Sequence, residues 1–356
     1  MPSQVQSIIR AATRDHGGKL NILTFPTHER YESNLCRTGH NFYSVVCKNY
    51  TKEGWDLDYA EVPENYSIIH DINDIPLLLD VDIVLSQNKY GQFELAREIA
   101  NRYHCPMVSL EHTCPPSTTL STDVDDDGKR QFYALPDGTI ESCYQKRGDI
   151  NLFISEWSRK EWGWKENEAE VIHHGINTDD FLPAIPMEER DSDAISVVNY
   201  WEERNWCCGY GLWQEIVKRG GFPTKVVGKN PGLSEPAKDI NNLVEKYNSS
   251  RVFLNTSVAS PIPTTVLEAM ACGCAIVSTA TCMIPEIIEH GRNGLISNDA
   301  KELAEYVNAI REDVNLAQRL GEEARKTIEE RFSIGNFVDR WNSIFLKASI
   351  MGERLV

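Results

Sequence analysis

The chain has 356 residues, 41% of them hydrophobic, and a formal net charge of −17. This length allows two domains of ordinary size, and no apolar run is long enough to span a bilayer. The negative charge disfavours sequence-independent binding of nucleic acid or anionic lipid over the whole surface, although it does not exclude a local basic groove. Because no secretory signal pattern precedes residue 20, we expect a cytoplasmic protein whose ten cysteines are mostly buried, reduced thiols.

Strand-like and helix-like segments alternate through the first half of the chain. The predicted strands are residues 20–25, 41–46, 82–85, 107–110 and 151–155, and the predicted helices are residues 93–103 and 156–162, the latter capped by Ser155. This alternation is typical of a parallel sheet with crossing helices. It predicts a Rossmann-like N-terminal domain over residues 1–180.

The second half repeats the alternation after a linker at residues 178–193, which is rich in charge and contains two prolines. The predicted strands are residues 195–199, 225–228, 251–255 and 275–277, and the predicted helices are residues 239–247, 300–311, 315–331 and 336–350. We therefore predict a second Rossmann-like domain over residues 181–335. The chain as a whole is assigned to the α/β class.

Residues 257–278 are the most informative stretch, because they predict a loop, a helix, a tight turn and a buried strand. Pro261 and Pro263 suit a helix start, Thr264 and Thr265 are candidate caps, and Gly273 suits a left-handed helix end.

A helix that starts after a parallel strand attracts anions through its free amides and its dipole. Glu268, one turn further along, could then accept hydrogen bonds from a ribose diol beside a bound phosphate. The alternative is an ordinary structural unit in which Glu268 merely faces solvent.

The same stretch resembles the donor-site segment of retaining glycosyltransferases of family 4, which have the GT-B fold. The matching residues are 268–273 (Glu-Ala-Met-Ala-Cys-Gly), and residues 284–294, 320–325 and 331–333 also resemble the family sequence. The resemblance is good from about residue 151 to residue 344 and weak before that. It implies two domains that face a cleft, with helix 336–350 packing back on the first.

The resemblance also implies roles for residues of the second domain. Arg204 takes the position of the arginine that neutralises the donor diphosphate, whereas Gly209 stands where a lysine is usual, so Lys229 is the candidate replacement. In the alternative interpretation, Arg204 forms a surface ion pair with Glu202 or Glu203. Ser260 replaces the usual first glutamate, which leaves room near the donor sugar and implies a donor other than ordinary glucose.

On the N-terminal side, His112 follows a predicted strand, where α/β sheets place ligand groups. The resemblance implies that such a histidine lies near the reacting sugar; Asn88 is a weaker candidate, and the alternative is that His112 only binds a loop. The first loop carries residues 28–30 (His-Glu-Arg) where many GT-B enzymes have paired glycines. We expect a structural role for His173 and a cleft-facing one for His174.

Residues 117–148 are polar and turn-rich, which predicts an insertion or a mobile flap that could shape the acceptor side. Within it, residues 123–128 match the start of a calcium-binding EF-hand loop, but Ala134 stands where a bidentate glutamate is required. A solvated acidic loop is the preferred interpretation.

The function predicted from these residues is transfer of a hexosyl or pentosyl group from a nucleotide sugar to an acceptor hydroxyl. The resemblance implies retention of configuration, no metal and no separate cofactor, with the nucleotide sugar as substrate. The predicted catalytic residues are His112 and Arg204. The residues predicted to bind the nucleotide sugar are Arg204, Lys229, Ser260, Pro263, Thr264, Thr265 and Glu268.

A glycan or another small molecule is the expected acceptor. Residues 27–31, 55–56 and 63–66 resemble bacteriophage-encoded members, so transfer to hydroxymethylated bases in DNA is an alternative that the negative charge disfavours. A non-catalytic nucleotide-binding relative is the alternative of another class, and a GT-B epimerase or phosphorylase is less favoured.

Overall fold

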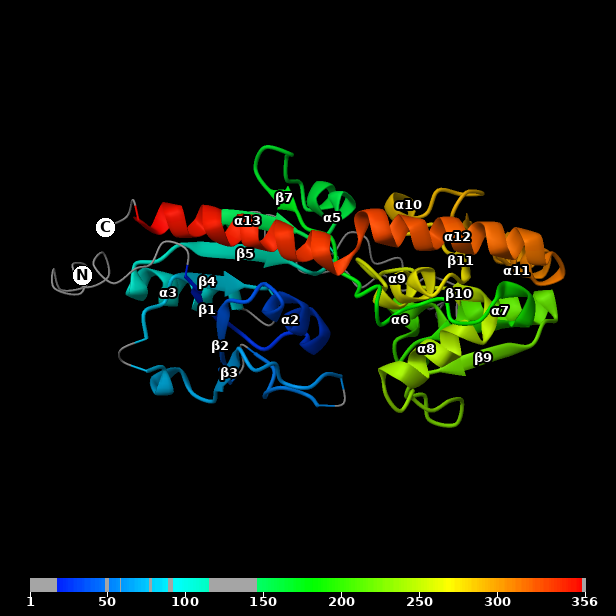
Figure 1. Cartoon of the computed structure of the whole chain (residues 1–356), viewed down its shortest axis with the longest axis horizontal. Helices are drawn as coiled ribbons and strands as arrows, with labels where there is room; N and C mark the ends of the chain where they lie inside the picture. The colour runs from blue at the N-terminus through cyan, green and yellow to red at the C-terminus, as the bar shows by residue number, and fades with distance from the viewer. Residues whose placement is uncertain are drawn as a thin grey trace, which may run out of the picture.

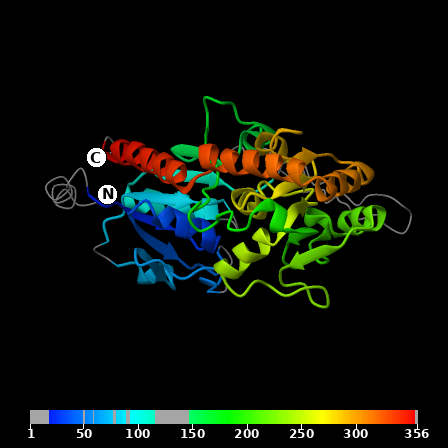
Figure 2. The same cartoon turned by 45° about the vertical axis from the view of Figure 1, so that its right-hand side comes forward.

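The computed structural model describes residues 18–48, 51–57, 59–76, 79–88, 92–114 and 146–353. Within them the chain forms two parallel sheets, each with its own helices, which lie side by side in Figure 1 and stay so in the turned view of Figure 2. The predicted α/β class is confirmed. Nearly all of the insertion predicted at residues 117–148, with its acidic run at 123–128, lies outside the described residues.

The first sheet has seven strands in the order β3-β2-β1-β4-β5-β6-β7, all paired in parallel. Its strands are β1 (Asn21–Thr24), β2 (Asn41–Val45), β3 (Tyr66–Ile69), β4 (Ile83–Ser86), β5 (Met107–Glu111), β6 (Ile150–Phe153) and β7 (Glu170–Val171). Its helical segments are α2 (Glu29–Cys36), η1 (Ile72–Asp74), α3 (Gln92–Tyr103) and α5 (Glu156–Glu161).

The second sheet has five parallel strands in the order β12-β11-β10-β8-β9. Its strands are β8 (Asp191–Val197), β9 (Thr224–Val227), β10 (Ser250–Asn255), β11 (Ala275–Ser278) and β12 (Leu295–Ile296). The helical segments that follow β7 along the chain are η3 (Met187–Glu189), α6 (Asn205–Cys208), α7 (Tyr210–Gly220), α8 (Ile240–Asn248), α9 (Thr264–Ala271), α10 (Ile284–Ile287), α11 (Ala300–Glu312), α12 (Val314–Arg331) and α13 (Ile334–Glu353).

Each sheet has a point where its strand order reverses. In the first sheet β2 and β3 lie on one side of β1, and β4 to β7 lie on the other, so the reversal lies between β1 and β4. In the second sheet the reversal lies between β8 and β10. Ligands of open α/β sheets bind beyond the carboxyl ends of the strands at such points. The loops that follow β1, β4, β8 and β10 are therefore the places to look for a site.

Several predicted boundaries differ from the structure. β8 begins at Asp191, inside the predicted linker, and Met187 to Glu189 form the turn η3. The strand β3 and the helix α7 were not predicted. Glycines at both ends of α7 lower its helix propensity, yet Trp213 and Ile216 bury one of its faces against α11.

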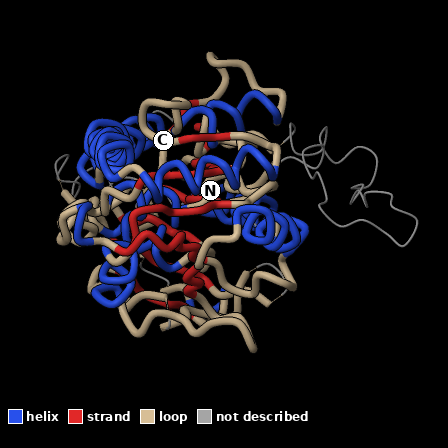
Figure 3. The backbone as a smooth tube through the Cα atoms, turned by 90° about the vertical axis from the view of Figure 1, so that its right-hand side faces the viewer, coloured by secondary structure: helices blue, strands red, loops and turns tan. Residues whose placement is uncertain are grey.

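The last helix, α13, packs against α2 and β4 of the first sheet, and Phe345 contacts the rings of His40 and Phe42. Figure 1 shows this helix running along the domain that contains the first sheet. Seen end-on in Figure 3, helices lie on both sides of the strands. The boundary between residues 180 and 181 stays a prediction.

None of the helices in the described ranges is long and apolar enough to cross a membrane.

Candidate donor-binding site

The helix α9 begins where the strand β10 has ended and a buried loop has turned back. Pro263 is its N-cap residue, with φ −72° and ψ 102°, and the amide of Val266 donates to the Pro263 carbonyl at 3.0 Å. Thr264 and Thr265 are thus the first helical residues, and the prediction that they cap the helix is wrong, because the extended Pro263 already starts it. Gly273, at φ +71°, follows the helix in the predicted left-handed conformation.

The first amides of α9 are available to a ligand. Among the described residues, the N–H groups of Thr264 and Thr265 make no hydrogen bond, as is usual for a helix start. Both residues and Ser260 are half-buried at this end of the helix. The dipole of α9 adds partial positive charge here, so the site favours an anion.

Glu268 lies one turn inside α9 and is only 3% exposed, so the alternative of a solvent-facing carboxylate is wrong. One carboxylate oxygen accepts from Nη1 of Arg30 at 2.7 Å, and the other accepts from the phenol of Tyr247 at 2.8 Å. Burial and the neighbouring carboxylate raise the pKa of Tyr247 well above its usual value, so the phenol keeps its proton and donates.

Arg204 and Lys229 follow the neighbouring strands β8 and β9, and both lie next to Tyr200. The amide of Arg204 donates to the Tyr200 carbonyl at 2.9 Å, and Nζ of Lys229 lies 5.7 Å from the centre of the Tyr200 ring. Both side chains are exposed. No ion pair joins Arg204 to Glu202 or Glu203 in the part of the chain that the structure describes.

The turn that carries Arg204 also contacts the loop before α9. The amide of Val258 donates to the carbonyl of Cys207 at 2.9 Å, so α6 and that loop are held together. The pKa of the Cys207 thiol is lowered to about 7, first by a hydrogen bond from Cys208 and also by the positive charge of Arg204.

Gly209 has a structural reason to lack the lysine that the resemblance places there. It has φ +68°, and a Cβ atom at this position would lie 2.1 Å from the carbonyl oxygen of Thr256. A side chain therefore fits neither the backbone conformation nor the space.

On the first sheet, His112 follows β5 and is nearly buried, at 9% exposure. Its Nε2 lies 3.0 Å from Oε1 of Gln87, and its ring packs edge-on against Tyr31 at 4.6 Å. His174 also contacts the Tyr31 ring, at 5.0 Å. Asn88, the weaker candidate, instead binds Ser109 at 2.9 Å.

The helix α2 connects these two groups of residues. Its first turn follows β1 and carries Arg30, which contacts Glu268, next to Tyr31, which contacts His112 and His174. Sequence reasoning noted residues 28–30 only as a departure from the family pattern and assigned no role to Tyr247. The signal that was present is a cluster of charged residues directly after a strand at a reversal point.

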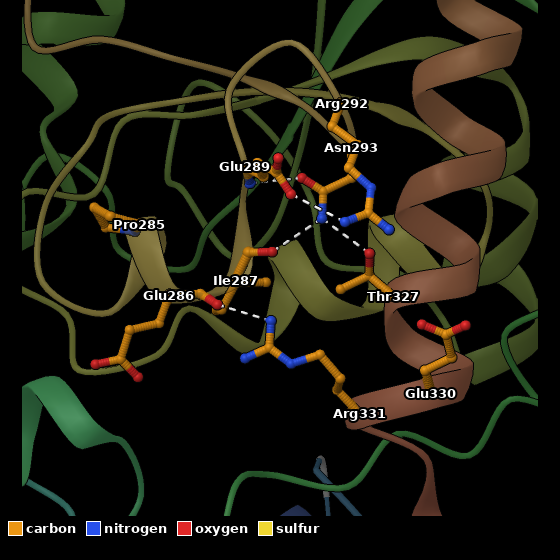
Figure 4. Close-up of a pocket in the computed structure, with 9 residues that line it drawn as sticks. All are labelled: Pro285, Glu286, Ile287, Glu289, Arg292, Asn293, Thr327, Glu330 and Arg331. Atoms are coloured by element: carbon orange, nitrogen blue, oxygen red, sulfur yellow. Dashed lines mark hydrogen bonds and ion pairs between the residues drawn. The ribbon is translucent and has the colours of Figure 1, made fainter.

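A separate pocket of about 340 Å³ lies between α10 and α12, as Figure 4 shows. None of the predicted site residues lines it. Its polar groups already bind one another: Asn293 donates to the Ile287 carbonyl and to Thr327, and Arg331 donates to the Glu286 carbonyl. This pocket is not the candidate site.

Comparison with known proteins places a family match in the second half of the chain. Residues 236–327, which include α9 and its flanking strands, match the model of the family described as Glycosyl transferases group 1. An alpha-maltose-1-phosphate synthase from Mycolicibacterium smegmatis is 34% identical over 113 residues, which cover 30% of this chain and 29% of that protein. The aligned segments cover about three tenths of the length of the first curated relatives.

Solved structures match nearly the whole chain. A sucrose-phosphate synthase from Thermosynechococcus elongatus superposes with a TM-score of 0.70 at 13% identity, covering 92% of this chain and 99% of that one. Anabaena Alr3699/HepE, solved in complex with UDP and glucose, superposes with a TM-score of 0.68 at 11% identity, covering 92% of this chain and 99% of that one. The chain therefore has the GT-B fold, and its residues 236–327 are similar to the glycosyl transferases group 1.

Proposed function

We propose that the protein transfers a sugar from a nucleotide sugar to the hydroxyl of an acceptor. The observation that carries this proposal is a buried carboxylate, Glu268, one turn inside a helix whose first amides are unbonded, at the reversal point of the second sheet. A nucleoside diphosphate needs both features in this order: anion-binding amides for its phosphates and a hydrogen-bond acceptor for its ribose diol.

The charges around α9 suit departure of the diphosphate. Negative charge grows on the leaving phosphate as its bond to the sugar breaks. The amides of Thr264 and Thr265, with Arg204 and Lys229 as the proposed cations, would stabilise this charge more in the transition state than in the bound substrate. These amides and cations are the groups proposed to stabilise the leaving phosphate, and we propose that they act without a metal.

The sugar of the donor would lie between the two sheets, near Ser260 and the group formed by His112, Tyr31 and His174. We propose transfer of a hexosyl or pentosyl group with retention, in which the departing phosphate takes the proton of the acceptor hydroxyl. The small, neutral side chain of Ser260 favours a donor other than ordinary glucose. His112 is the histidine proposed to contact the reacting sugar.

The acceptor side is formed by the first sheet, and we propose a glycan or small-molecule hydroxyl there. Modified DNA is the less favoured acceptor because the chain carries a net charge of −17. Binding to DNA that falls steeply as salt rises would reverse this preference.

A panel of UDP-, GDP-, CDP- and dTDP-sugars tests the donor proposal. Wild-type protein should show an upward shift of its melting temperature with at least one of them, and slow hydrolysis of the same donor without acceptor. Both should persist in EDTA. No shift with any of the four donors would refute the proposal, and binding without hydrolysis or transfer would identify a non-catalytic nucleotide-binding protein.

A further inference from the structure

An ion pair between Arg30 and Glu268 joins the two lobes of the molecule. Arg30 lies in the first turn of α2, directly after β1 of the first sheet, and Glu268 lies in α9 beside the second sheet. Their closest atoms, Nη1 and Oε1, are 2.7 Å apart, across 238 positions of the sequence. This contact brings a cation to the carboxylate that the proposed function assigns to the ribose.

Each oxygen of the Glu268 carboxylate already accepts one hydrogen bond in this state. Arg30 holds one oxygen and the Tyr247 phenol holds the other, and the Glu268 side chain is 4% exposed. A ribose diol needs an oxygen of the same carboxylate. Since Arg30 reaches Glu268 from the opposite lobe while Tyr247 belongs to the same lobe, Arg30 is the partner that a ribose would displace.

The guanidinium of Arg30 remains able to bind a second group. A guanidinium carries five N–H donors, and the described residues provide Arg30 with a single side-chain hydrogen bond, to Glu268. The side chain is 41% exposed. A guanidinium with free donors matches the oxygens of a phosphate in pairs.

The diphosphate of a bound donor would lie within reach of this side chain. Glu268 is four residues from Thr264, so the ribose carboxylate and the anion-binding amides are separated by about 6 Å along α9. An arginine carries its guanidinium on a flexible three-carbon stem. Movement of the guanidinium over this distance would leave the backbone of α2 in place.

We propose that Arg30 is a donor-binding residue that exchanges partners. It holds Glu268 while the site is empty; when the ribose takes Glu268, Arg30 turns to the diphosphate and adds a cation to Arg204 and Lys229. This inference rests on the proposed function, because it needs a nucleotide at Glu268. Arg30 of α2 would contact the second domain directly through Glu268 before the exchange. After the exchange it would contact the ligand bound to that domain.

The exchange makes opposite predictions for two related ligands. In the Arg30→Gln variant a nucleoside, which has the diol but no phosphate, should bind at least about threefold tighter than to wild type, because its competitor is gone. The nucleoside diphosphate should lose its advantage over the nucleoside by about tenfold, because a charge-assisted contact to phosphate is missing.

Calorimetric titration of UDP, GDP, CDP and dTDP and of the four matching nucleosides measures both effects. Arg37→Gln is the matched control, because Arg37 ends the same helix, is exposed and removes the same charge; it should leave both affinities within about twofold of wild type. Arg30→Lys keeps the charge and should recover part of the diphosphate preference, which separates lost charge from lost folding.

Two kinds of failure are distinguishable. A wild-type protein that binds none of the four diphosphates refutes the proposed function and the inference with it. A wild type that binds one of them, with Arg30→Gln weakening nucleoside and diphosphate equally or changing neither, refutes the exchange alone and leaves the proposed function standing.

Discussion

A lysine introduced at position 209 should lower the stability of the protein and should not strengthen donor binding. Gly209 has φ +68°, which costs an ordinary L-residue about 1–2 kcal/mol. The added Cβ would also lie 2.1 Å from the Thr256 carbonyl oxygen, and relieving that overlap by moving backbone costs a further ~1–3 kcal/mol. We therefore expect Gly209→Lys and Gly209→Ala each to lose about 2–5 kcal/mol of unfolding free energy.

Urea denaturation measures this loss, and Gly221→Ala is the matched control. Gly221 has φ +64° but no atom within 4 Å of its added Cβ, so it isolates the backbone cost of about 1–2 kcal/mol. The difference between Gly209→Ala and Gly221→Ala reports the collision with Thr256. Equal losses at the two positions, or a Gly209→Lys variant that keeps its stability and binds nucleoside diphosphate more tightly, would refute this reasoning.

Three further outcomes are expected. Arg204→Ala should weaken nucleoside diphosphate binding at least about tenfold while leaving nucleoside affinity unchanged, which calorimetry measures; equal losses would remove Arg204 from the diphosphate site. Tyr247→Phe should cost about 1–3 kcal/mol in urea unfolding, because one oxygen of buried Glu268 loses its donor. Burial, and then the charge of Arg331, lower the pKa of His173 from 6.5 to about 4. Since the unfolded state then binds the extra proton, stability should fall as pH drops from 6.5 towards 4; in His173→Phe, which preserves stacking on Phe332, this dependence should be weaker, and an unchanged pH profile would contradict it.

The unit β10–α9–β11 could be predicted because its signals are local. Apolar runs mark both strands, Pro263 precedes the helix and Gly273 follows it, and the structure has a helix from Thr264 to Ala271 between them. Thr264 and Thr265 were predicted as caps, but the helical conformation begins at Thr264, so the N-cap position falls on the extended Pro263, which offers no side-chain hydrogen bond. Ser155, by contrast, caps α5 as predicted, accepting from the amide of Ser158 at 2.9 Å.

The contacts that define the site could not be read from local patterns. Arg30 and Glu268 meet because two separate sheets are brought together, and nothing in the residues around either one indicates the other. From the sequence, Gly209 could be interpreted only as the loss of a lysine. The structure shows that its left-handed backbone and its closeness to Thr256 exclude a side chain. Short strands such as β7, with two residues, carry too little pattern to predict and are held by their neighbours in the sheet.

In the proposed function, Glu268 binds the ribose of a donor whose diphosphate lies at the start of α9. A double-mutant cycle tests it directly: wild type and Glu268→Gln are each titrated with a nucleoside diphosphate and with its 2′,3′-dideoxy analogue. Loss of the two hydroxyls should weaken binding to wild type at least about tenfold and binding to Glu268→Gln hardly at all, because a hydroxyl bound to a carboxylate contributes more than one bound to an amide. The same loss in both proteins, or no loss in wild type, would contradict the account.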